Sequence, residues 1–158
     1  NYLNADPDKQ NAYKQAVAKA EALLNKQSGT NEVQAQVESI TNEVNAAKQA
    51  LNGNDNLANA KQQLANLTHL NDAQKQSFES QITQAPLVTD VTTINQKAQT
   101  LDHAMELLRN SVADNQTTLA SEDYHDATTQ RQNDYNQAVT AANNIIYQTT
   151  SPTMNPDD

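Results

Sequence analysis

The residues that could do chemistry in this chain are three histidines and a modest set of carboxylates. His103 precedes Glu106 by three positions and Glu122 precedes His125 by three, so each pair would share one face of a helix. Such a pair could give two ligands to a zinc ion, whereas zinc sites in proteins take three or four. The three histidines, His69 included, fall on different predicted helices or turns. We therefore expect solvent-exposed histidines and no metal site.

Hydrolytic and phosphate chemistry have no pattern to support them either. Adjacent carboxylates at Glu122–Asp123 and Asp157–Asp158 lie at predicted termini, where acidic groups favour the helix dipole. A hydrolase would need two carboxylates facing one cleft, with one of them desolvated. The serines have no neighbouring base in a recognisable pattern, and the two glycines are isolated, which excludes a glycine-rich phosphate loop. The chain is predicted to have no catalytic residues and no cofactor.

The composition indicates an all-α protein. The 158 residues include 23 Ala, 21 Asn and 19 Gln, but two Gly, four Pro and no Cys. Ala and Gln are good helix formers, and so few Gly and Pro leave little material for β turns. The net charge of −9 argues against a nucleic-acid partner, and no apolar run approaches the roughly 20 residues of a membrane helix. A hydrophobic fraction of 36% predicts thin cores.

An internal repeat connects the two ends of the chain. Residues 2–26 align with residues 124–148 at an offset of 122 positions, with nine identities in 25 pairs. The identical pairs are Tyr2/Tyr124, Ala5/Ala127, Gln10/Gln132, Asn11/Asn133, Tyr13/Tyr135, Gln15/Gln137, Ala16/Ala138, Val17/Val139 and Ala20/Ala142. Two interpretations of the tyrosines stay open, namely filling of a thin core and contact with a partner.

Apolar spacing predicts a helical hairpin at the start of the chain. A stripe over residues 13–24 follows Asp6-Pro7-Asp8, a typical helix start, and ends at the turn Ser28-Gly29-Thr30. A second stripe runs from Val33 to Leu51 in steps of four and three, the period of coiled-coil packing. Gly53 is then expected to be a C′ residue in the left-handed conformation.

Further helices are expected in the middle and at the end. Leu57 to Leu67 marks a short helix, and Asn71 or Asp72 can cap the next, which stops near Pro86. Asp123 or Asp126 could cap the last helix, which bears the apolar stripe Tyr135, Ala138, Val139, Ala142, Ile145 and Ile146. The tail 151–158 is predicted to be a linker.

The longest pattern steps by three and four from Val91 to Leu119 and predicts one helix from Leu87 to about Ala120. At 1.5 Å per residue it would be roughly 50 Å long. We expect it to close one bundle with its first half and open the next with its second half. A break or loop between Leu101 and Leu119 would contradict the stiff rod and replace it with a chain of loosely tethered bundles.

Two sets of motifs resemble known repeat modules. The central set resembles the GA module, a three-helix bundle of Gram-positive surface proteins, some of which bind serum albumin: Leu57-Ala-Asn-Ala-Lys61, Leu70-Asn-Asp-Ala-Gln-Lys-Gln-Ser-Phe78, Gln81-Ile-Thr-Gln-Ala85 and Val91-Thr-Thr-Ile94. The flanking set resembles FIVAR modules: Tyr13-Lys-Gln-Ala-Val17, Tyr135-Asn-Gln-Ala-Val139 and Leu51-Asn-Gly53. Their alternation resembles the repeat region of giant staphylococcal cell-wall-associated proteins that bind extracellular matrix.

The resemblance implies three modules. Residues 1–53 would be the last two helices of a FIVAR-like unit, 54–112 a complete GA-like three-helix bundle, and 113–158 the first two helices of the next FIVAR-like unit with a tail. The expected fold class is therefore all-α, with tandem three-helix bundles in an elongated rod joined by a long shared helix. Incomplete flanking bundles should leave apolar faces exposed.

The resemblance also implies a function. It predicts a non-enzymatic segment of a bacterial cell-surface or cell-wall adhesin, a stiff spacer with many weak contacts to host matrix or serum proteins such as fibronectin or albumin. The alternative is a dedicated albumin- or fibronectin-binding module. Because the helix matching Gln74–Gln84 contacts the ligand in albumin-binding GA modules, the candidate partner-binding residues are Gln74, Ser77 and Gln81. Neighbouring repeats of the same chain are further expected partners; membrane and nucleic acid are not.

Overall fold

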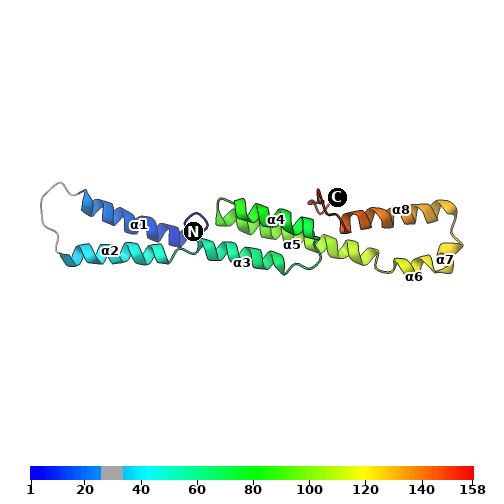
Figure 1. Cartoon of the computed structure of the whole chain (residues 1–158), viewed down its shortest axis with the longest axis horizontal. Helices are drawn as coiled ribbons and strands as arrows, with labels where there is room; N and C mark the ends of the chain where they lie inside the picture. The colour runs from blue at the N-terminus through cyan, green and yellow to red at the C-terminus, as the bar shows by residue number, and fades with distance from the viewer. Residues whose placement is uncertain (26–33) are drawn as a thin grey trace. The chain divides into compact units, whose positions relative to one another are not determined.

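A computed structural model describes residues 1–25 and 34–158, so the expected turn at residues 28–30 and Val33 lie outside the described residues. All regular structure in the two described ranges is helical (Figure 1), which confirms the predicted all-α class. The chain divides into two compact units, and each is described by itself. Unit 1 comprises Asn1–Asn59 and Ala85–Val91, and unit 2 comprises Ala60–Gln84 and Thr92–Asp158.

Unit 1 contains the predicted hairpin, formed by α1 (Pro7–Leu24) and α2 (Gln34–Gln49), which lie side by side (Figure 1). Pro7 fits the first turn of α1 because that position needs no N–H donor. Ala16 is buried in α1, whereas no residue of α2 is buried. Leu24 is 83% exposed and Val37 45%, so both depart from the buried stripes predicted for them. Two helices bury only one narrow strip of each other, and these residues lie off that strip.

Gly53 has a different role from the one predicted. It is the first residue of α3 (Gly53–Ala65), and none of the described glycines has a positive φ. A Cβ at this position would overlap the backbone carbonyl of Asn1 and lie 2.9 Å from the backbone nitrogen of Ala5. The left-handed C′ assignment is therefore wrong. Glycine is needed because residues 1–5 pass directly over the start of the helix.

Unit 2 contains a core formed by α4 (Asp72–Gln84), most of α5 (Val88–Ser111) and the second half of α3. Phe78 and Ile82 of α4 point inward as predicted, with 2% and 0% exposure. The other buried apolar side chains of this unit are Ala60, Leu64, Leu70, Ala73, Ala98, Leu101, Met105, Ala142 and Ile146. α4 ends two residues before Pro86, as expected from the steric restriction that proline places on the residue before it.

The predicted helix to Ala120 is wrong beyond Ser111. α5 ends there, residues 112–114 form a turn, and the five-residue helix α6 (Asn115–Leu119) follows. The Ser111 hydroxyl donates to the carbonyl of Leu108 (2.7 Å), the acceptor that the Val112 amide would use in a continued α-helix. The Val112 amide instead bonds to the carbonyl of Arg109 (3.4 Å). Backbone continuity of one helix therefore does not join the successive helical segments.

The caps of the last helices also differ from the prediction. α7 (Glu122–His125) is capped by the Ser121 side chain, which accepts from the Tyr124 amide. α8 (Thr129–Ile146) is capped by Thr128, and not by either of the two aspartates proposed from the sequence. Hydroxyl side chains in extended backbone conformation fit the N-cap position as well as carboxylates do. None of the described helices is both long and apolar enough to cross a membrane.

Candidate functional site

The three candidate partner-binding residues, Gln74, Ser77 and Gln81, all lie on α4 but in different environments. Gln74 has 0% exposure, and both ends of its amide are used inside the protein. Its Oε1 accepts from the Asn71 backbone N–H (2.9 Å), while its own backbone N–H donates to Asn71 Oδ1 (2.9 Å). Its Nε2 donates to the carbonyl of Thr153 (2.8 Å). Gln74 is therefore not part of the exposed surface of α4 that a partner could contact.

The other two candidates face outward. Gln81 is exposed and Ser77 is half-buried, and Gln81 Nε2 donates to Ser77 Oγ at 3.4 Å across one helical turn. This surface of α4 offers amide and hydroxyl groups, with no aromatic or aliphatic anchor of the kind that dominates tight interfaces. The role of these two residues in partner binding stays a prediction.

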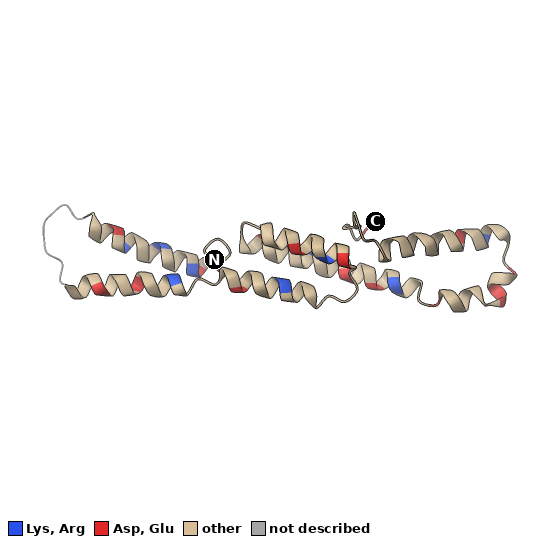
Figure 2. Ribbon diagram, viewed as in Figure 1, with Lys and Arg blue, Asp and Glu red and all other residues tan. Residues whose placement is uncertain are grey.

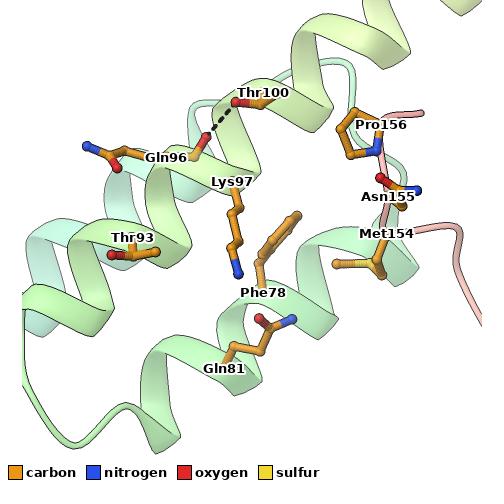
Figure 3. Close-up of a pocket in the computed structure, with 9 residues that line it drawn as sticks. All are labelled: Phe78, Gln81, Thr93, Gln96, Lys97, Thr100, Met154, Asn155 and Pro156. Atoms are coloured by element: carbon orange, nitrogen blue, oxygen red, sulfur yellow. Dashed lines mark hydrogen bonds between the residues drawn. The ribbon is translucent and has the colours of Figure 1, made fainter. Parts of the chain in front are cut away.

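Gln81 also lines a pocket of about 540 Å³ between α4, α5 and the tail segment Met154–Pro156. Figure 3 shows the Phe78 ring between the two helices, with the Met154 side chain directed toward it and Lys97 reaching in from α5. Lys97 is the one charged residue among those that line the pocket. The pocket could bind an apolar side chain of a ligand against Phe78 and Met154, and Lys97 could pair with an acidic group beside that side chain.

A polar cluster in unit 2 fixes the connection before α4. Asp102 of α5 accepts from the backbone N–H groups of His69 (2.8 Å) and Leu70 (3.0 Å), and its other oxygen lies 3.0 Å from His69 Nδ1. Burial alone would raise the pKa of Asp102, but the hydrogen bonds from His69 and Leu70 outweigh it, so the pKa lies below its ordinary value. Arg109 Nε donates to the His69 carbonyl (2.9 Å).

This cluster corrects the interpretation of one histidine. His69 is half-buried and paired, not a plain solvent-exposed residue, because α5 brings Asp102 to it from 33 positions away. His103 behaves as its spacing predicted, with Nδ1 at 3.3 Å from Glu106 Oε2 on an exposed face. Over residues 1–25 and 34–158, no three His, Asp or Glu side chains come together as a metal ion would require.

Both copies of the internal repeat build the same local structure. The rings of Tyr2 and Tyr13 lie 5.8 Å apart, and those of Tyr124 and Tyr135 lie 6.0 Å apart. In each copy one glutamine closes the connection before the helix. Gln10 Nε2 donates to the carbonyls of Leu3 and Ala5, and Gln132 Nε2 donates to those of Tyr124 and His125. These contacts support the packing interpretation of the tyrosines.

The tyrosine hydroxyls of the second copy have polar partners. Tyr135 donates to Asn115 Oδ1 (3.1 Å), which holds α6 against α8, and Tyr124 accepts from Asn136 Nδ2 (2.9 Å). Charged residues of both signs occur along the described helices. Figure 2 shows Lys and Arg spread singly over the described helices, interspersed with Asp and Glu.

Two family models match the chain. The FIVAR domain matches residues 1–52 and 104–158, and the GA module matches residues 52–104. The chain therefore belongs to the FIVAR domain family and carries a GA module between its two FIVAR segments. Both resemblances drawn from the sequence motifs are confirmed.

The relatives are long proteins. The chain is 96% identical over its whole length to the extracellular matrix-binding protein EbhA of Staphylococcus aureus strain Newman, of which it spans 5%. It is equally identical to the extracellular matrix-binding protein ebh of strain NCTC 8325, of which it spans 2%.

Two solved structures share the helical-bundle fold. A crystal structure of a Staphylococcus aureus EbhA domain is 41% identical with a TM-score of 0.66, and the match covers 96% of this chain and 61% of that one. A structure concerned with Embp-mediated adherence of Staphylococcus epidermidis to fibronectin is 30% identical with a TM-score of 0.64, and the match covers 66% and 83%.

Sequence reasoning missed part of the polar framework. Asn71, one of the two caps proposed for α4, does accept from the Gln74 amide, whereas the reciprocal bond of Gln74 was missed although Asn71-x-x-Gln74 has the spacing of a capping box. For Asp102 and Arg109 no local signal exists, because their partners lie 32 to 40 positions away in the sequence.

Proposed function

We propose that this chain is a non-enzymatic segment of an extracellular bacterial adhesin, a spacer that presents many weak contacts to host matrix proteins. The observation that carries the proposal is the recurrence of one FIVAR structure on both sides of a GA module. The tyrosine pair recurs 122 residues apart, and the equivalent glutamines Gln10 and Gln132 donate to the equivalent carbonyls of Leu3 and His125. Repeated units of weak affinity bind with high avidity when several of them engage the ligand at once, so no single tight site is required.

The names of the relatives support the matrix as the target class. The two staphylococcal proteins at 96% identity are called extracellular matrix-binding, and the Embp structure is connected with adherence to fibronectin. An extracellular location follows from the same comparison. Fibronectin is therefore the first ligand to test, and the exposed surface around Ser77 and Gln81 is the first surface to alter.

The test compares one copy of the chain with a tandem array of four copies in biolayer interferometry on immobilised fibronectin. We expect a single copy to bind with a Kd weaker than about 1 µM, and the array to bind on the order of 10² to 10⁴ times more tightly. Ser77→Arg with Gln81→Arg should weaken binding about tenfold. Gln137→Arg, on the exposed face of α8, is the matched control and should leave binding unchanged.

The same measurement separates the alternative. A single copy that binds fibronectin or serum albumin with nanomolar affinity would indicate a dedicated ligand-binding module. An array that binds no more tightly than one copy would contradict the multivalent spacer.

A further inference from the structure

The start of α4 is closed by a pair of carboxamide side chains, Asn71 and Gln74, which we call the amide pair. Each backbone N–H of the pair donates to the other's side-chain oxygen at 2.9 Å, which is the geometry of a capping box. Both residues are buried, with 9% and 0% exposure. This closure uses only the oxygens of the two amides, so the two NH₂ groups remain to be accounted for.

Both NH₂ groups donate to segments of the following FIVAR region. Asn71 Nδ2 donates to the carbonyl of Ile145 in the last turn of α8 (3.0 Å), 74 residues along the chain. Gln74 Nε2 donates to the carbonyl of Thr153 (2.8 Å), 79 residues along the chain. Thr153 is itself fixed, because its N–H donates to Gln148 Oε1 and its hydroxyl accepts from Gln148 Nε2. The tail is therefore held in place and is not a free linker.

We propose that the amide pair makes the joint between the GA module and the FIVAR helices after it rigid. The inference rests on the proposed spacer function. The stiffness that a continuous helix was expected to supply is lost where α5 ends at Ser111. The two long-range hydrogen bonds of the amide pair, one to α8 and one to the tail, act in its place. Losing either bond leaves a buried donor unpaired, which the native joint avoids.

The other FIVAR segment has a comparable joint at the start of α3. Asn52 Nδ2 donates to Asp6 Oδ2 (2.9 Å), and Asn56 Nδ2 donates to the Asn4 carbonyl (2.8 Å) and to Asp6 Oδ1 (3.0 Å). Residues 1–6 correspond to 123–128 in the internal repeat. In this chain, carboxamide side chains therefore hold each FIVAR segment to the GA module.

The test deletes the two long-range donors, to α8 and to the tail, without removing the cap. Asn71→Ser keeps an N-cap oxygen and Gln74→Glu keeps the acceptor for the backbone N–H of residue 71, so the pair retains a capping box. The ionised glutamate has no donor, and the serine hydroxyl ends one atom short of the position of the asparagine Nδ2. Gln81→Glu introduces the same chemical change on the exposed face of α4 and is the matched control.

The readout is the distance between two spin labels, measured by electron double resonance. The chain has no native Cys, so labels at Ser80→Cys in α4 and Gln137→Cys in α8 report on the joint alone. A second pair, at Ser80→Cys and Gln62→Cys, reports on the interior of the GA bundle. All three positions are exposed.

We expect a single narrow joint distance in the parent chain and in the Gln81→Glu control. In the chain with Asn71→Ser and Gln74→Glu, the joint distribution should broaden at least twofold while the intra-bundle distance stays narrow. A joint distance that stays narrow overturns the proposal. So does broadening of both distances, since the pair would then support α4 itself. Fibronectin binding plays no part in this measurement, so the proposed function can fail while the joint is shown to be rigid, and the reverse.

Discussion

At the residue scale, a few side chains have roles set by backbone groups far away in the sequence. Gly53 and Asp102 are the clearest cases, since one makes room for residues 1–5 and the other accepts from the backbone before α4. Each role follows from one close approach, so each can be tested by one substitution.

Gly53→Ala should destabilise unit 1. The added Cβ meets the backbone of Asn1 and Ala5, which cannot rotate aside as a side chain would. We expect a loss of about 1–3 kcal/mol in the free energy of unfolding, measured by urea denaturation with circular dichroism. Asn59→Ala, on an exposed position of the same helix, should change it by less than about 0.5 kcal/mol. An unchanged stability of Gly53→Ala would show that residues 1–5 do not hold this position in solution.

Asp102 should make the stability of unit 2 depend on acid. Its folded pKa lies below the ordinary value of 3.8, because hydrogen bonds from His69 and Leu70 outweigh burial. The ionised carboxylate therefore contributes stability above pH 3.8, and this contribution is lost as the pH falls through the lower folded pKa.

Asp102→Ala leaves two backbone N–H groups without their acceptor and should lower stability at pH 7 by about 1–3 kcal/mol. The difference from the parent chain should be smaller at pH 2.5 than at pH 7, because the contribution of the carboxylate declines as the pH falls below 3.8. Urea midpoints at the two pH values measure this. Asp123→Ala, at an exposed position, should show no comparable difference at either pH.

At the element scale, the existence of the helices could be predicted from the sequence, whereas their ends could be predicted only where a proline marks them, as at Pro7 and Pro86. The stripe from Val91 to Leu119 keeps one period across residues 112–114, so periodicity alone predicts a single helix there. At the end of α5 the Ser111 hydroxyl donates to the carbonyl of Leu108, a contact that no pattern of apolar residues records. Polar contacts at long separation, such as those of Asn71, were invisible for the same reason.

Ser111→Ala should extend α5. Without the hydroxyl, the Leu108 carbonyl is available to the Val112 amide, so the turn at residues 112–114 should gain helical character. Carbon-13 Cα shifts of these residues would report the change. Thr140→Ala removes a similar hydroxyl-to-carbonyl bond (2.8 Å) inside α8 and should leave the bounds of that helix unchanged. Unaltered shifts after Ser111→Ala would assign the end of α5 to another cause.

At the scale of the whole molecule, the modules could be recognised from their motifs, whereas what holds them to one another could not. The GA and FIVAR matches agree with the motifs at Tyr13, Phe78 and Tyr135. The division of the chain at residues 53 and 112 stays a prediction. The long-range hydrogen bonds of the joint come from two carboxamides, Asn71 and Gln74. The chain has 40 Asn and Gln residues, so composition does not single these two out.

The spacer proposal predicts an extended particle in solution. A compact domain of 158 residues would have a radius of gyration of about 15 Å, and small-angle X-ray scattering should give a clearly larger value. The chain with Asn71→Ser and Gln74→Glu should scatter as a more flexible particle of unchanged helix content. A radius of gyration near the compact value would contradict the spacer.

The amide pair has a consequence for the conditions under which such a joint can work. Its four hydrogen bonds run between carboxamides and backbone groups, all of them uncharged. Dissolved ions screen electrostatic interactions between charged groups, and none of these four hydrogen bonds involves a charged group. The surface ion pair of Lys19 and Glu43 should weaken between dilute buffer and molar sodium chloride. The joint at the amide pair should keep the same geometry in both solutions.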